Sequence, residues 1–457
     1  MAGVHRCWGQ HVRRWALGIY AGLTWLAQPF LRRKLARRSL QEPGYSQAIE
    51  ERFGHYSHPA EAAPELVWVH AVSLGETRTA AVLLKALRAR HPGLRLLLTH
   101  GTATGRAEGK SLLQPGDVQV WQPWDSQAVV TRFFTHFKPR LGLLMETEVW
   151  PLTIAAANTH AVPLVLVNAR LSEKSLQQAL HMSPLSYPAY GALAKVLAQT
   201  DDDAGRFRQL GVTPAGVLGN LKFDATPDAQ QLATGRAWRK ALGQPVLMFA
   251  SSREGEELDF FKQISALRQS AQGFGAINSV ANNFKVLLVP RHPQRFGEVQ
   301  ALAAQHGLRV SRRSSWRAGP WPDDDAMQAD VWLGDSLGEM ALYYALSDVA
   351  LLGGSFAPLG GQNLIEAAAC GCPVVMGPHT FNFQQAAELA EQAGAALRAP
   401  DLQHGLQAAL ALVSDAAAQA AAASKSLAFA DRNRGATAKT VAALVPFLNA
   451  QTPYIPA

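Results

Sequence analysis

An acidic residue follows an apolar run in the segment HAVSLGE, residues 70–76. The apolar run, 65–70, is typical of a strand, and the residues after it open a helix. Glu76 then falls in the first helical turn, where the helix dipole favours its ionised form. A positioned carboxylate can take a proton from a hydroxyl group, so Glu76 is a candidate general base. Taken alone, the motif is more typical of a helix-cap glutamate.

Two further charged segments occur in the first half of the chain, one directly after a strand-like run and the other at the end of the first expected domain. METEVWP places Glu146 and Glu148 directly after the apolar run 140–145. These carboxylates either lie in a cleft or occupy the first turn of a helix. GNLKFD carries Lys222, whose ammonium group could offset the negative charge of a phosphate or a carboxylate. A lysine on a surface loop is the alternative.

Candidate anion-binding groups follow the strand-like runs of the second half. Arg291 and His292 stand between two prolines in VPRHP, and arginine binds phosphate through two parallel hydrogen bonds. A rigid surface turn explains this motif equally well. GDSLGEM, residues 334–340, and GGSFAPLGGQNLIEA, residues 353–367, each lead a loop into a helix whose N-terminal amides could receive a phosphate. In the second of them Glu366 could hold ribose hydroxyls. Ordinary capped helix starts are the alternative for both.

Short apolar runs alternate with longer helical patterns, which predicts two α/β domains with doubly wound parallel sheets. Such sheets bind ligands at the carboxyl ends of their strands, where the motifs above fall. The polar segment 224–235 is the expected linker between the domains. The expected strands are 65–70, 94–99, 117–121, 140–145, 162–168 and 194–199 in the first half, and 246–250, 285–290, 331–334, 348–353 and 373–377 in the second.

Composition excludes several classes of protein. The chain has 457 residues, of which 48% are hydrophobic and 17% charged, so it is not a disordered protein. Three cysteines do not make a disulfide scaffold. Eight basic residues precede the first acidic residue, Glu42, and the remaining chain has equal numbers of basic and acidic residues. A neutral body argues against nucleic-acid binding.

The N-terminal segment has the pattern of a membrane-anchor helix. Residues 15–31 contain no charged side chain and are flanked by basic clusters. As a helix they would span about 26 Å, slightly less than the hydrocarbon core of a bilayer. Pro29, near their end, marks where this helix should stop. A short tilted span and an interfacial helix are both compatible with this pattern. A buried core helix and a cleavable signal peptide are the weaker alternatives. Arg32, Arg33, Lys34, Arg37 and Arg38 would then meet anionic lipid on the cytoplasmic side.

Signals for metals, cofactors and covalent nucleophiles are poor. Cys370 and Cys372 have no second cysteine pair, and the histidines show no metal-binding spacing. No GxSxG motif is present, and neither glycine-rich segment matches the nicotinamide or P-loop fingerprints. We therefore expect no metal and no cofactor.

Six of these segments and a seventh, NARLSEKS at 168–175, occur in one order, and together they resemble the family of 3-deoxy-D-manno-octulosonic acid (Kdo) transferases of Gram-negative bacteria. The segments are HAVSLGE, METEVWP, NARLSEKS, GNLKFD, PRHP, GDSLGEM and GGSFAPLGGQNLIEAAACGCPVVMGPHTFNF. The resemblance implies a GT-B fold with two Rossmann-like domains and a central cleft. It implies an anchor segment at 1–43, an acceptor domain at 44–226 and a donor domain at 227–457. It also implies inverting transfer of Kdo from CMP-Kdo to the lipid A precursor lipid IVA, at the cytoplasmic face of the inner membrane.

The resemblance also implies roles for individual residues. Glu76 matches the general base of the family, and Glu146 and Lys222 match groups that stabilise the transition state. Three segments match CMP-binding positions of the family, and they comprise Arg291 and His292; Leu337, Gly338 and Glu339; and Asn363, Leu364, Ile365 and Glu366. Gln362 stands where the family usually has histidine, and Leu364 and Ala367 stand where it usually has proline.

Three other interpretations remain open at this point. One is a different GT-B glycosyltransferase, such as a lipid A disaccharide synthase that uses a UDP-sugar. Another is a nucleotide-sugar epimerase of the same fold, which would not need an anchor. The third is an inactive membrane scaffold. The sequence leaves the number of transferred Kdo residues and the oligomeric state undetermined.

Overall fold

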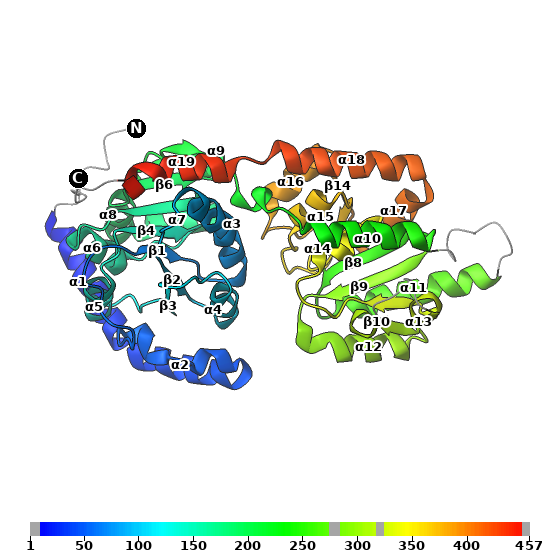
Figure 1. Cartoon of the computed structure of the whole chain (residues 1–457), viewed down its shortest axis with the longest axis horizontal. Coiled ribbons are helices and arrows are strands. Elements are labelled where there is room, and N and C mark those ends of the chain that lie inside the picture. Colours follow the sequence, from blue (N-terminus) through cyan, green and yellow to red (C-terminus); the bar gives the residue numbers. More distant parts are fainter. Residues whose placement is uncertain (1–9, 274–283, 317–323, 450–457) are drawn as a thin grey trace. The chain divides into compact units, whose positions relative to one another are not determined.

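The computed structural model describes residues 10–273, 284–316 and 324–449 (Figure 1). The chain forms two compact units. The first unit comprises residues 1–224 and 434–457, and the second comprises 225–433. Each unit is an α/β layer structure around one parallel sheet, as the alternation of apolar runs and helical patterns predicts.

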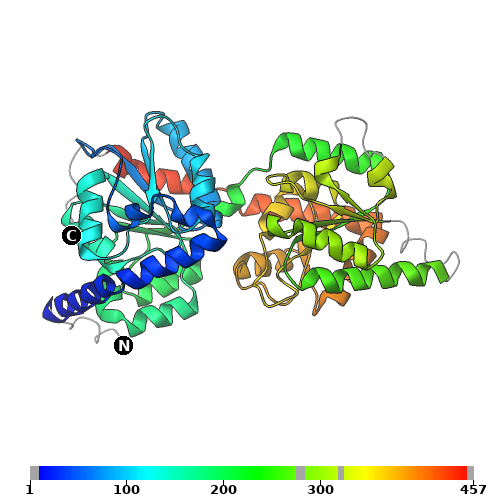
Figure 2. The ribbon, with the colours of Figure 1, turned by 90° about the horizontal axis from the view of Figure 1, so that it is seen from below.

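The first unit is built on a seven-stranded sheet in the order β3-β2-β1-β4-β5-β6-β7, in which every pair is parallel. Alternate side chains of β1 belong to two different hydrophobic clusters, because helices cover both faces of the sheet (Figure 2). The strands are β1 (Val67–His70), β2 (Leu96–His100), β3 (Val118–Trp121), β4 (Leu141–Met145), β5 (Leu164–Ala169), β6 (Lys195–Ala198) and β7 (Gly216–Val217). The helices between them are α3 (Leu74–Arg90), α4 (Ala103–Lys110), α5 (Gln127–Phe137), α6 (Pro151–Thr159), α7 (Glu173–His181), α8 (Ser183–Gly191) and α9 (Asp201–Gln209).

The second unit repeats this plan with the strand order β10-β11-β9-β8-β12-β13-β14, again entirely parallel. Its strands are β8 (Val246–Ser252), β9 (Lys285–Pro290), β10 (Val310–Arg312), β11 (Val331–Leu333), β12 (Val349–Leu352), β13 (Val374–Met376) and β14 (Ala396–Arg398). Its helices are α10 (Ala229–Leu242), α11 (Glu256–Gly273), α12 (Phe296–Gln305), α13 (Asp324–Gln328), α14 (Met340–Leu346), α15 (Leu364–Cys370), α16 (Gln384–Gln392), α17 (Leu402–Ser414) and α18 (Ala416–Arg432).

The last described helix, α19 (Ala436–Asn449), belongs to the first unit rather than to the second. Val441, Leu444 and Leu448 lie in the core that also contains the apolar side of α3. Asp224 fixes the start of this helix by accepting hydrogen bonds from the backbone N–H groups of Gly435 and Thr437. The structure therefore differs from the expected donor domain of 227–457 at its C-terminal end.

Two helices precede the first sheet, where the sequence predicts one uncharged helix over 15–31. Helix α1 (Gln10–Leu26) ends before Pro29, and α2 (Gln28–Gln41) begins at Gln28 with Pro29 in its first turn, where proline is tolerated. The expected continuous helix is thus wrong, because the chain breaks at Ala27. Among the described residues, no single helix is both long and apolar enough to cross a membrane, although the bent pair Leu402–Ser414 and Ala416–Asn449 meets the criteria of length and composition.

Candidate active site

Glu76 lies in the first turn of α3, directly after the loop that leaves β1. Ser73 caps this helix, because its hydroxyl accepts a hydrogen bond from the Glu76 N–H at 3.3 Å. The Glu76 carboxylate in turn accepts hydrogen bonds from the Val72 N–H at 2.7 Å and from the Ser73 hydroxyl at 3.2 Å. This reciprocal arrangement resembles a capping box in which the Val72 N–H replaces that of the N-cap residue, so the structural role expected of a helix-cap glutamate is present.

The same carboxylate also has the electrostatics of a base. Burial raises the pKa of Glu76 to about 7, and the charges of Glu146 and Glu148 add to that rise. The Val72 N–H and His70 act in the opposite direction and do not outweigh it. A carboxylate with a pKa near the working pH both accepts a proton readily and is substantially ionised before it does so. Capping and basicity are therefore compatible in one residue.

Glu146 begins the loop after β4, the strand that pairs with β1. Its backbone adopts a left-handed conformation with φ of 57°, which costs a residue with a side chain about 1–3 kcal/mol. Backbone hydrogen bonds to Val167 and from Arg170 hold that conformation. The strained backbone presents the carboxylate to Lys222, whose Nζ lies 2.8 Å from Oε1 in a mostly buried ion pair.

Lys222 is positioned by a polar contact from another strand. It belongs to a short 3-10 turn, Leu221–Asp224, and Asn168 in β5 accepts a hydrogen bond from the Leu221 N–H at 3.0 Å. Asn168 is buried and also left-handed, with φ of 53°. The NARLSEKS and GNLKFD segments are thus linked in space. The structure brings Glu76, Glu146 and Lys222 together at one edge of the sheet, as the sequence predicts for residues that follow parallel strands.

His70 and Glu148 form a second buried pair that no role was predicted for. His70 Nε2 lies 3.7 Å from Glu148 Oε2, and His70 Nδ1 lies 2.8 Å from the Thr99 hydroxyl. Burial opposes ionisation of Glu148, but the neighbouring imidazole outweighs it and the pKa of Glu148 is lowered. Trp150 also donates to this carboxylate at 2.8 Å. Glu148 therefore stays charged and contributes to the raised pKa of Glu76.

In the second unit, Arg291 and His292 follow β9. The Arg291 N–H donates to the Ser252 carbonyl at the end of β8, at 3.0 Å, which fixes the turn to the neighbouring strand. His292 lies among the guanidinium groups of Arg253, Arg291 and Arg295. Burial and these three positive charges lower the pKa of His292. Arg295 is held in ion pairs with Glu257 at 2.8 Å and Glu298 at 2.9 Å, so an anion at the carboxyl ends of β8 and β9 would meet the charges of Arg253 and Arg291.

The segment with Leu337, Gly338 and Glu339 precedes α14. The Leu337 side chain is exposed, and the Gly338 carbonyl accepts a hydrogen bond from the Gln231 side chain at 2.9 Å. Glu339 accepts from Arg313 at 2.8 Å and from the Ser336 hydroxyl. This carboxylate is therefore engaged within the chain, and the helix behind it has only seven residues.

The segment from Asn363 to Glu366 starts α15, which is also seven residues long. The Asn363 side chain caps it by accepting from the Ile365 N–H at 3.2 Å. Leu364 and Ile365 are buried, so their side chains pack in the protein and only their backbone can meet a ligand. Glu366 is partly exposed.

No group of three or more His, Cys, Asp or Glu side chains suited to a metal ion occurs within the described ranges. Cys370 and Cys372 are both buried, and burial raises the pKa of the Cys370 thiol to about 12. A thiol with that pKa is neither a nucleophile nor a ready metal ligand at neutral pH.

Two units, each built on a parallel seven-stranded sheet with helices on both faces, give the chain a GT-B-like fold. A putative UDP-N-acetylglucosamine 2-epimerase from Listeria monocytogenes has a similar solved structure, with a TM-score of 0.52, 14% identity and coverage of 85% of this chain and 98% of that one. This likeness shows the fold alone.

Sequence relatives are more specific. A model of the 3-deoxy-D-manno-octulosonic-acid transferase (kdotransferase) family matches residues 47–225. The 3-deoxy-D-manno-octulosonic acid transferase of Bordetella pertussis is 46% identical over 445 residues, which cover 96% of this chain and 100% of the relative. That of Haemophilus influenzae is 30% identical over 370 residues, which cover 80% and 83%. The chain belongs to the Kdo transferase family, and it is a glycosyltransferase.

Proposed function

We propose that the chain transfers Kdo from CMP-Kdo to the lipid A precursor lipid IVA, with inversion at the anomeric carbon. The observation that carries this proposal is the carboxylate of Glu76, whose pKa is raised to about 7 beside the Glu146–Lys222 pair. Membership of the Kdo transferase family supplies the sugar, and the order of the sequence motifs supports CMP as the leaving group.

In this proposal Glu76 is the general base. Its carboxylate takes the proton from a primary hydroxyl of the acceptor as that oxygen attacks the anomeric carbon of Kdo. The new carbon–oxygen bond forms while the bond from the anomeric carbon to the CMP phosphate breaks, and the electron pair leaves with the phosphate. Attack opposite to the leaving group inverts the anomeric centre. The capping hydrogen bonds from Val72 and Ser73 hold the base in one orientation.

The remaining residues carry charge for the same step. Lys222, held by Glu146, supplies positive charge against the negative charge that develops in the transition state. Arg291 and His292 contact the CMP phosphate, while the segments 337–339 and 363–366 bind the rest of the nucleotide. Positive charge and backbone amides neutralise the single phosphate of CMP, and the proposal includes no metal and no cofactor.

The proposal also places the enzyme on the cytoplasmic face of the inner membrane, through α1 and α2. One side of α1 packs on the first unit, where Leu17 and Tyr20 meet its core and the Thr24 carbonyl accepts from the Trp124 indole at 2.8 Å. The opposite side carries exposed apolar residues at helical spacing, namely Val12, Trp15, Ile19, Leu23 and Leu26. Figures 1 and 2 show both helices, in blue, along the outside of this unit.

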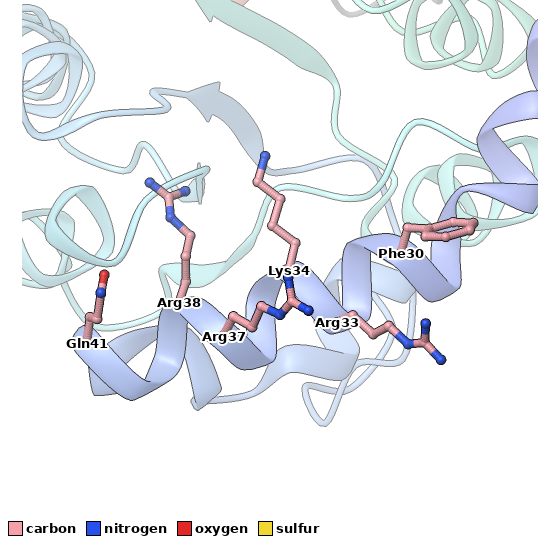
Figure 3. Close-up of a pocket in the computed structure, with 6 residues that line it drawn as sticks. All are labelled: Phe30, Arg33, Lys34, Arg37, Arg38 and Gln41. Atoms are coloured by element: carbon pink, nitrogen blue, oxygen red, sulfur yellow. The ribbon is translucent and has the colours of Figure 1, made fainter.

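Helix α2 continues this surface with positive charge. Phe30, Arg33, Lys34, Arg37, Arg38 and Gln41 line a concavity of about 410 Å³, and Figure 3 shows their side chains leaving successive turns of α2. An apolar stripe beside a basic cluster suits the interface of an anionic bilayer, with the stripe in the acyl boundary and the cations at the headgroups. A helix that is packed on the protein along one side favours this interfacial arrangement over a span.

The transfer reaction is tested with CMP-Kdo generated in situ and tetraacylated lipid IVA, and the product is read by mass spectrometry. Wild-type enzyme is expected to add Kdo, to retain activity when chelator is added after the donor has formed, and to lose activity as Glu76→Ala. The mass increment counts the sugars added. A folded wild type that binds CMP and transfers nothing to lipid IVA would overturn the acceptor assignment.

Membrane association is tested by sedimentation with vesicles of phosphatidylcholine, with and without phosphatidylglycerol. Wild type is expected to bind the anionic vesicles and to release as salt rises, and Arg33→Glu with Arg37→Glu is expected to weaken that binding. Glu108→Gln, a change on the exposed side of α4, is the control and should bind like wild type. Equal binding of the charge-reversed variant would contradict a role for α2.

A further inference from the structure

The carboxylate of Glu256 occupies the amides of a glycine-rich loop in the second unit. Glu256 begins α11 directly after β8 and is buried. Its oxygens accept hydrogen bonds from the Gly354 N–H at 2.8 and 2.9 Å and from the Ala357 N–H at 3.2 Å. They also accept from the Arg253 N–H at 2.9 Å. Both oxygens accept in these contacts; burial raises the pKa of Glu256, and the backbone N–H groups act against that rise.

The loop that Glu256 holds leads into a predicted nucleotide-binding segment. The Gly353 N–H donates to the Ala250 carbonyl in β8, at 2.8 Å, so the loop leaves β12 in a fixed direction. Gly354 is left-handed, with φ of 68°, and its carbonyl accepts from the Gly361 N–H at 2.8 Å. Gly361 stands two residues before Asn363, the cap of α15. A short path of hydrogen bonds therefore joins Glu256 to the start of that helix.

A loop of successive N–H groups is ordinarily an anion-binding nest, and the sequence of the GGSF segment predicts such a site for a phosphate. Here the anion is a side chain of the chain itself. A donor phosphate cannot use the Gly354 and Ala357 amides while the Glu256 carboxylate fills them. It is left with the basic cluster at the ends of β8 and β9, where Arg253, Arg291 and His292 lie.

We propose that Glu256 is a positioning residue for the sugar-nucleotide donor: its carboxylate fills the nest of the Gly353–Ala357 loop and thereby orders the backbone that presents Asn363 and Glu366. The inference rests on the proposed CMP-Kdo donor. It assigns the glycine-rich loop to support of the nucleotide site and the basic cluster to the phosphate.

The first test is CMP binding by calorimetry with full-length enzyme. Glu256→Gln turns one acceptor into a donor that faces backbone N–H groups, and CMP affinity should fall about tenfold. The CMP affinity of Glu256→Ala should fall at least as far. Formate should restore part of that affinity by entering the vacated nest, and chloride at equal ionic strength should not. A destabilised fold alone would not respond to formate in this way.

Asp348→Asn is the matched control. Asp348 is a mostly buried carboxylate of the same unit. It accepts hydrogen bonds from the Val246 N–H and from Arg239 at the amino ends of β8 and β12, the end of the sheet opposite to Glu256. This variant should lose stability and keep the wild-type affinity for CMP. If Glu256→Gln is folded and binds CMP within twofold of wild type, the inference is wrong. If wild type itself does not bind CMP, the proposed donor fails instead.

Hydrogen exchange in the wild-type enzyme tests the proposal without any variant that has to fold. Hydrogen exchange at the Gly354 and Ala357 amides should be slow without CMP and should change little when CMP is added. Fast exchange at these amides in the free enzyme, with protection appearing only on CMP binding, would show an open nest that receives the nucleotide, and it would overturn the proposal.

Discussion

Glu76 and Glu256 occupy equivalent places in the two units and have different partners there. Each follows a central strand, β1 or β8, at the point where the order of strands changes direction across β1 and β4 or across β8 and β12. Glu76 accepts one backbone N–H and one hydroxyl and has two carboxylates nearby. Glu256 accepts from three backbone N–H groups. Burial raises the pKa of both carboxylates, so they differ in their partners: backbone N–H groups hold Glu256 against a loop, whereas Glu76 has two further carboxylates beside it.

The charges near the candidate residues also differ between the two units. Burial and carboxylates raise the pKa of Glu76, whereas burial and three arginines lower the pKa of His292. The first unit therefore favours uptake of a proton, and the second favours a bound anion. Both units also strain the backbone at strand ends, with Glu146 at φ of 57° and Ser251 at φ of 55°. The candidate functional residues are concentrated beyond the carboxyl ends of the central strands in each sheet.

The largest expected effect comes from Glu76→Gln. Removal of the base should slow transfer by about 10²–10⁴-fold and leave CMP affinity unchanged, because CMP contacts are assigned to the second unit. The folded-state pKa of Glu76 lies above its ordinary value, so its ionisation favours unfolding as pH rises from about 4.5 through about 7. At pH 8 the variant should therefore unfold at a temperature no lower than wild type. A marked loss of CMP affinity in Glu76→Gln would contradict the assignment of CMP binding to the second unit alone.

Arg291→Ala should produce the next largest effect, and on binding rather than on proton transfer. Loss of a charged hydrogen bond to phosphate is expected to weaken CMP binding by about tenfold to a hundredfold. Arg291→Lys should recover only part of it, because lysine does not form the paired contact of a guanidinium. Calorimetry with CMP measures both. Full affinity in Arg291→Ala would remove the phosphate from this cluster.

Lys222→Met should have a smaller effect on turnover. The charge that stabilises the transition state is lost, and we expect transfer to fall by about tenfold. Glu146 loses its ion-pair partner, so the melting temperature should also fall. CMP affinity is the discriminating control, since it should stay at the wild-type value. A turnover that follows the loss of folded protein alone would leave Lys222 with a structural role only.

The smallest expected effect is a gain in stability. Ser251→Gly relieves a left-handed conformation in the second unit and should raise the free energy of unfolding by about 1 kcal/mol. CMP affinity should stay the same, because the relief is confined to the backbone of β8. Denaturant unfolding checks the sign. A loss of stability would mean that the Ser251 side chain contributes more than its strained backbone costs.

The sequence predicts the central strands well because long apolar runs mark strands that are buried on both faces. It misses β7, β10 and β14, which have only two or three residues each. It also places α19 with the wrong neighbours, because an alanine-rich helical pattern does not say which core receives it. Pro29 predicts that the N-terminal helix stops near it, and in the structure that helix ends at Leu26, three residues earlier.

The candidate site was predictable as a set of segments and not as a network. Strand–loop–helix order places Glu76, Glu146 and Arg291 at strand ends, where the structure has them. The contact between Glu256 and Gly354 joins residues 98 positions apart, and SREGEE is typical of an ordinary helix start with an acidic first turn. His70 was visible in its motif, but only the fold shows Glu148 beside it.

The most direct test of Glu76 as the base is the pH dependence of kcat/KM for transfer to lipid IVA, in wild type and Glu146→Gln. Wild-type activity should rise with pH to a plateau, with an apparent pKa of about 7, because the base acts in its ionised form. Glu146→Gln removes a charge that raises this pKa, so the acid limb should move down by about one pH unit. Glu108→Gln, with its carboxylate paired to Arg78, should leave the limb in place. A flat profile, or an acid limb that stays fixed in Glu146→Gln, would contradict the account.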